Sequence, residues 1–118
     1  MRIVTSFVFI LALAFSCTYS NEEELFGDSN CPTNNLTYAK DIRPIVEGNG
    51  CVGCHNSGSE SGGVNLDGYD NLKNYPDRLY GAINHDANYA AMPPSGIKID
   101  SCQIAQVKAW IDQGMTKE

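Results

Sequence analysis

Apolar residues recur at helical spacing in two stretches of the chain, one on each side of a long glycine-rich segment. In residues 37–49, TYAKDIRPIVEGN, the apolar side chains fall on one helical face. Thr37 is a suitable N-cap and Gly48 a suitable end. Pro44 stands inside the pattern and predicts a kink or an early end. The stretch therefore predicts the first helix of a domain.

The second stretch predicts a longer helix near the C-terminus. Asp100 and Gln103 have the spacing of a capping box, and Gly114 follows the last periodic residue. Ala105 and Ala109 are small enough to let another helix approach closely. The expected buried stripe comprises Ile104, Val107, Trp110 and Ile111.

The residues between these helices predict one short helix and much loop. NYPDRLYGAINH is a helix candidate in which Pro76 suits the first position. NSGSESGGVNLDGYD is rich in glycine and polar residues, which favours a loop. No internal repeat and no useful β alternation is present. We expect a small helical domain with long loops and a modest core.

The N-terminal residues predict an export signal over 1–16. Arg2 gives a positive start, and residues 3–15 are almost wholly apolar. This run is short for a membrane span, and no charged stop follows it directly. An N-terminal membrane anchor that is never cleaved is the alternative.

Cys17 follows the apolar run directly, as in a bacterial lipoprotein signal, where the cysteine is lipidated. Such signals prefer Leu where this chain has Ala14, and cleavage by ordinary signal peptidase is the alternative. Residues 17–30 are polar and predict a flexible acidic tether spanning about 20 Å. The acidic run Glu22–Glu24 resembles a lipoprotein sorting signal. The alternative is that it is only a solvent-exposed part of the tether. The folded domain is then 31–118.

The chain length and the net charge restrict the classes of function that the protein can have. The chain has 118 residues, which is enough for one small domain, and a formal net charge of -6. An acidic chain lacks the basic face that nucleic acid requires and is not attracted electrostatically to an anionic membrane. Five cysteines is a high and odd number for this length. In an exported protein such cysteines indicate disulfides or haem.

The motif Cys51-Val52-Gly53-Cys54-His55 is the attachment signature of c-type haem. Two thiols three residues apart can reach the two vinyl groups of one haem, and the following histidine can bind the iron. Zinc would need further ligands at related spacing, and no second Cys-x-x-Cys is present. A thioredoxin-like pair would need a βαβ context, and a Cys51–Cys54 disulfide would close a strained ring.

Met92 is the candidate for the second axial ligand. It lies in NYAAMPPSG, where two prolines stiffen the backbone and remove amide donors. His85 is the rival, because bis-histidine ligation is known, but it suits an exposed helix end equally well. Met115 lies near the end of the last helix and is poorly placed.

These motifs together resemble the small monohaem cytochromes c of class I, of the exported or lipoprotein type. The resemblance runs from Asn35 to Met115 and rests on YAKDIRPIVEGNGCVGCH, GGVNLDGYDNL, AAMPPSG and IAQVKAWIDQG. It implies an all-α fold of 3–5 short helices around one covalent haem c, with long loops and with the first and last helices crossing at small residues. It implies thioether bonds at Cys51 and Cys54, His55 as proximal ligand and Met92 as distal ligand.

In the fold that the resemblance implies, Cys31 and Cys102 stand at helix ends that could lie near each other. We expect a disulfide between them, worth about 2–4 kcal/mol. A Cys17–Cys31 pairing without lipid is the alternative.

A haem with both axial positions filled favours electron transfer over substrate chemistry. We therefore expect an electron carrier rather than an enzyme, in the periplasm or on the cell surface. Its partners would be a redox protein donor and acceptor, with a membrane attachment through the lipid and no nucleic acid or small-molecule substrate. A haem subunit of a larger oxidoreductase, or a small peroxidase or ligand sensor with an open distal site, is the alternative.

Overall fold

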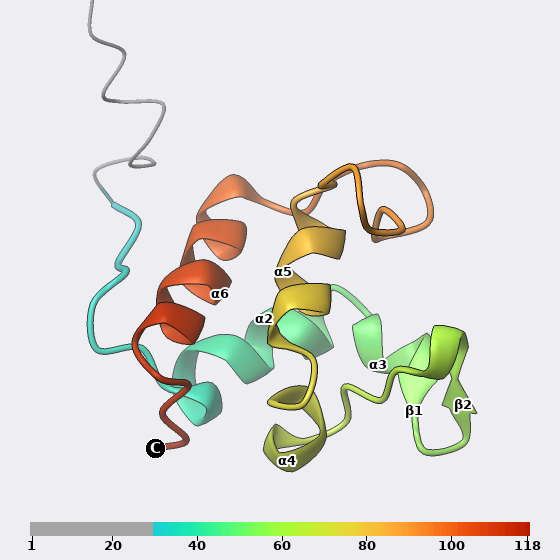
Figure 1. The fold of residues 1–118 in the computed structure, drawn as a ribbon. Helices are drawn as coiled ribbons and strands as arrows, with labels where there is room; N and C mark the ends of the chain where they lie inside the picture. Colours follow the sequence, from blue (N-terminus) through green and yellow to red (C-terminus); the bar gives the residue numbers. More distant parts are fainter. Residues whose placement is uncertain (1–29) are drawn as a thin grey trace, which may run out of the picture.

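The computed structural model describes residues 30–118 (Figure 1). The expected signal peptide, Cys17 and nearly all of the expected tether lie outside the described residues. In chain order the elements are η1 (Tyr38–Ile42), α2 (Arg43–Gly48), α3 (Cys51–Cys54), β1 (His55–Asn56), β2 (Ser59–Glu60), η2 (Ser61–Gly63), α4 (Tyr69–Leu72), α5 (Pro76–Ile83) and α6 (Ser101–Asp112).

The first helical segment consists of two elements that meet next to Pro44. Thr37 caps it, because its side chain accepts a hydrogen bond from the Lys40 amide at 3.3 Å. The wide π turn of η1 leads into α2, where Pro44 occupies the first turn. Proline lacks an amide hydrogen and fits the first turn, so the wide turn and α2 meet at this point. The segment ends at Gly48.

The last helix, α6, begins at the predicted cap. The Asp100 carboxylate accepts hydrogen bonds from the amides of Cys102 and Gln103. The Gln103 side chain does not return to the cap, because it accepts a hydrogen bond from Asn49 at 2.9 Å. That bond joins the end of α2 to the start of α6. The predicted capping box is therefore replaced by a tertiary contact.

The core draws on η1, α2, α4, α5 and α6, and Trp110, Val107, Ile42 and Leu72 are its most deeply buried side chains. The C-terminal residues close over it, because Thr116 accepts hydrogen bonds from the Tyr38 amide and the Trp110 indole, each at 2.9 Å. The C-terminus accordingly lies beside the first helix in Figure 1. Ala105 and Ala109 lie elsewhere, in a groove beside α5 that also includes Tyr80. The small residues expected between the first and last helices thus face α5.

The glycine-rich stretch contains more structure than the loop that its composition predicts. Strands β1 and β2 form a two-residue antiparallel hairpin, with His55 opposite Glu60. The Asn56 side chain closes its turn by accepting hydrogen bonds from the amides of Gly58 and Ser59. Each strand has only two residues, which is too short for the hydrophobic alternation that usually announces a strand. The described fold is thus helical with a small sheet.

The first described residues run along α6 and are fastened to it. Cys31 and Cys102 form a disulfide with a Cα–Cα distance of 5.6 Å. Gln106 of α6 and Gln113, which follows the helix, donate side-chain hydrogen bonds to the carbonyls of Pro32 and Thr33. The first residues of the domain are therefore held against its last helix. Within residues 30–118, no helix combines the length and apolar character needed to cross a membrane.

Candidate functional site

The two motif cysteines lie on the single turn of α3, which a glycine introduces. Gly50 precedes the turn with φ of 71°, a left-handed conformation that glycine adopts without strain. Cys51 is half-buried against the core and Cys54 is exposed. Burial raises the pKa of the Cys51 thiol, so this group is protonated at neutral pH. Both thiols are free in this structure.

His55 follows the turn and is held by the segment that ends the glycine-rich stretch. Its ring Nδ1 lies 3.2 Å from the Val64 carbonyl, and its own carbonyl accepts a hydrogen bond from the Leu66 amide at 2.8 Å. Because a carbonyl can only accept, Nδ1 carries the proton in this hydrogen bond. The other ring nitrogen, Nε2, then has a lone pair free to bind a metal.

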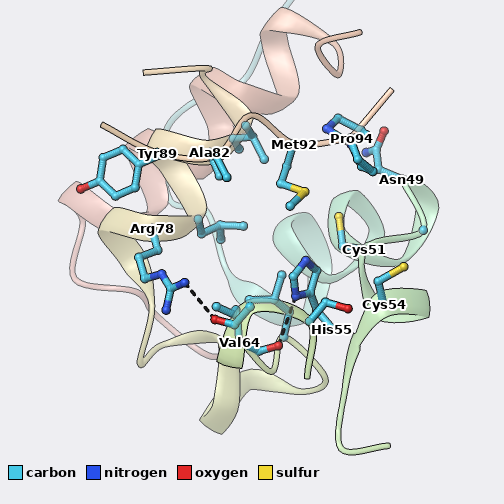
Figure 2. Close-up of a pocket in the computed structure, with 18 of the residues that line it drawn as sticks. Asn49, Cys51, Cys54, His55, Val64, Arg78, Ala82, Tyr89, Met92 and Pro94 are labelled. Carbon is cyan, nitrogen blue, oxygen red and sulfur yellow. Dashed lines mark hydrogen bonds between the residues drawn. The ribbon is translucent and has the colours of Figure 1, made fainter. Parts of the chain in front are cut away.

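A cavity of about 410 Å³ lies between α3, α5 and the loop that precedes α6. Cys51, Cys54, His55 and Met92 all line it. Figure 2 shows the His55 ring and the Met92 thioether pointing into the cavity from opposite sides. Most of the remaining wall is apolar, with Val64, Leu66, Leu79, Ala82, Ile83, Ala90, Pro93, Pro94 and Ile99.

The loop that carries Met92 is attached to the end of α5. The Met92 amide donates a hydrogen bond to the Ala82 carbonyl at 2.9 Å. The ring of Tyr89 packs directly on Gly81, leaving no room for a side chain there. The Met92–Pro93 peptide bond is cis. The backbone around Met92 is therefore fixed by α5, and its side chain is half-buried at the cavity wall.

His85 and Met115 do not line this cavity. The Nε2 atom of His85 lies 3.0 Å from the Met92 carbonyl, so this nitrogen is already engaged. The side chain of Met115 packs against the core, and its carbonyl accepts a hydrogen bond from the Tyr69 hydroxyl at 3.0 Å. The structure thus brings Met92, rather than the other two candidates, to the cavity that His55 lines.

Several cavity residues could not be predicted from the sequence. Arg78 contributes a guanidinium group, whose Nη2 donates a hydrogen bond to the Gly62 carbonyl at 3.1 Å (Figure 2). Asn49 lines the opposite end and bonds to α6. The spacing of Tyr69, Tyr75, Tyr80 and Tyr89 along the chain does not indicate which of them reaches the cavity. Of these four, Tyr89 lines its wall. No local motif marks Arg78 or Val64, since each reaches the cavity only through the fold.

The cavity has the properties that a flat, largely apolar cofactor requires. Its wall is apolar, two thiols lie at one edge, and an imidazole nitrogen and a thioether sulfur face its interior. In residues 30–118, no three His, Cys, Asp or Glu side chains gather closely enough to share a metal ion. Comparisons of the sequence with protein-family models and with curated proteins, and of the fold with solved structures, found no match.

Proposed function

We propose that the protein is an electron carrier that holds one c-type haem covalently, outside the cytoplasm. The observation that carries this proposal is the placement of His55 and Met92 on opposite sides of one apolar cavity, with Cys51 and Cys54 at its edge (Figure 2). The two thiols and the histidine come from adjacent positions in the sequence. The methionine comes from a distant loop, and only the fold brings it to the cavity.

Cys51 and Cys54 would hold the haem through thioether bonds. Each thiol adds its S–H across one vinyl group, so attachment needs no oxidant. One helical turn places the two sulfur atoms on the same side of the cavity, as attachment to a single porphyrin requires. Since Cys54 is exposed, the attachment edge lies near the surface. Covalent bonds would keep the cofactor in a cavity that is open to solvent.

His55 and Met92 would supply the two axial ligands. The Val64 carbonyl fixes the tautomer of His55 and leaves Nε2 for the iron. A ligand pair made entirely by the protein leaves no open coordination position, which favours outer-sphere electron transfer. When bound, the haem supplies a one-electron redox couple, and a thioether ligand gives it a moderately positive potential.

Arg78 would pair with a haem carboxylate. It carries the positive charge of the cavity wall, and its remaining guanidinium N–H groups are free to meet a propionate. The expected lipid at Cys17 would attach the domain to a membrane. The acidic surface suits a redox partner with a basic or mixed patch, and salt would weaken that pairing.

The test is an optical spectrum of protein produced with haem-maturation enzymes. We expect haem to remain with the protein in acidified acetone, and the oxidised form to show the far-red sulfur-to-iron band. Met92→Ala should abolish that band. Met115→Ala is the matched control, because Met115 lies outside the cavity, and the band should remain.

Other outcomes would distinguish the alternatives. Extraction of the haem would refute covalent attachment at Cys51 and Cys54. A stable haem without the band in wild type would refute Met92 as a ligand. Fast and complete binding of carbon monoxide to the ferrous protein would favour an open-site peroxidase or sensor. Tight co-purification with a larger oxidoreductase would favour a subunit role.

A further inference from the structure

The two backbone groups of Met92 are bonded to the end of α5 and to His85, which lies two residues beyond it. Its amide donates to the Ala82 carbonyl at 2.9 Å, and its carbonyl lies 3.0 Å from Nε2 of His85. A residue held at both its N–H and its C=O has little freedom to rotate. Because Cβ is attached to the same backbone unit, these two bonds also set the direction in which the Met92 side chain leaves the backbone toward the cavity.

The sequence around Met92 offers few other anchors. Pro93 and Pro94 follow it and have no amide hydrogen to donate. The residues before it, from Ala87 to Ala91, are exposed, apart from the ring of Tyr89, which packs on Gly81. The next backbone hydrogen bond after Met92 is a local one, from the Gly96 amide to the Pro93 carbonyl. The hydrogen bond from His85 is therefore one of two contacts that tie this residue to the helix.

The backbone conformation at position 85 does not explain a histidine there. His85 has φ of 59°, and its amide donates to the Ala82 carbonyl at 3.2 Å, an arrangement common at helix ends. Glycine or asparagine adopts this left-handed conformation more readily. What histidine adds is an imidazole that reaches the Met92 carbonyl. Since the carbonyl can only accept, Nε2 carries the proton.

We propose that His85 is a positioning residue that holds Met92 in place as an iron ligand. This inference rests on the proposed haem function. His85 does not line the cavity, so it would not contact a haem held there. It acts through the Met92 carbonyl, and its loss would leave Met92 itself bonded to α5 through its amide alone, while the Tyr89 ring on Gly81 still holds the rest of the loop. The sulfur would then be displaced more easily by an external ligand.

The experiment compares three replacements of His85 in the full, haem-loaded chain. His85→Gly removes the donor and suits the left-handed backbone, so it separates the imidazole from backbone strain. His85→Gln keeps a side-chain N–H donor. His85→Leu keeps bulk without a donor. Added imidazole competes with Met92, and the loss of the far-red band measures its apparent affinity.

We expect imidazole to bind about 2- to 12-fold more tightly to His85→Gly and His85→Leu, the range that one hydrogen bond provides. The His85→Gln affinity should lie closer to wild type. The urea midpoint of His85→Gly should not fall, because glycine relieves the backbone. A structural role alone would lower that midpoint and leave imidazole affinity unchanged, which would overturn the proposal.

The outcomes separate this inference from the proposed function. If wild type shows the band and all three variants bind imidazole as wild type does, His85 does not position Met92, while the haem function stands. If wild type retains haem but lacks the band, and a His85 variant gains it, His85 is itself a ligand and both proposals fail in their present form. If His85→Gly does not accumulate with haem, the imidazole affinities of His85→Leu and His85→Gln are compared instead. Tighter binding to His85→Leu supports the positioning role, and equal binding refutes it.

Discussion

Replacing Gly81 with alanine should weaken the attachment of the Met92 loop. A Cβ at position 81 would lie 2.7 Å from Cγ of Tyr89 and closer still to Cδ2 and Cε2. These atoms belong to the ring itself, and Cγ is one bond from the Tyr89 Cβ, so a small rotation at the end of the side chain gives no relief. The ring must leave the helix, or the loop must move with it.

The size of the effect follows from what the ring buries. Tyr89 is 37% exposed, so nearly two-thirds of it is packed. For an aromatic side chain that corresponds to about 100–160 Å². At about 25 cal/mol per Å², full displacement costs about 2.5–4 kcal/mol. Alanine in a helix recovers about 1 kcal/mol relative to glycine. We expect Gly81→Ala to lower the free energy of unfolding by about 1–3 kcal/mol, the usual range for overpacking.

Urea unfolding, followed by circular dichroism, measures this difference. Gly48→Ala is the matched control, because position 48 is also helical and its Cβ would meet nothing within 4 Å. A double-mutant cycle with Tyr89→Ala isolates the clash. In that background Gly81→Ala should be neutral or stabilising by up to about 1 kcal/mol. If the penalty persists without the tyrosine ring, the overlap is not its cause and the reasoning is refuted.

Three further changes test the scaffold. Replacing Cys31 and Cys102 together with serine should lower the free energy of unfolding by about 2–4 kcal/mol and leave the haem spectrum intact; a changed spectrum would show that the disulfide also shapes the site. Asp100→Ala should cost about 1 kcal/mol in urea unfolding, because two amides of α6 lose their acceptor; no change would mean that water replaces the cap. Tyr69→Phe should cost about 1 kcal/mol through the lost bond to the Met115 carbonyl, and an unaltered midpoint would contradict this.

Local features were predictable because neighbouring residues produce them. Thr37, Pro76 and Asp100 act within one or two helical turns, and each lies at the expected position in its helix. Pro44, expected inside one helix, instead lies in the first turn of α2, directly after η1. The hairpin was missed because a side chain of Asn56 builds its turn, without an alternating pattern to announce the strands. The function of the motif cysteines remains a prediction from their spacing.

The sequence by itself determined which groups stand together on and directly after α3, because Cys51, Cys54 and His55 are close neighbours along the chain. Only the tertiary structure decided what faces them. Met92 is far along the chain, and packing of its loop on α5 places the thioether across the cavity. The same packing turns His85 toward the Met92 carbonyl. Spacing fixes neighbours within a turn, whereas the opposite wall of a cavity depends on how separate elements pack together.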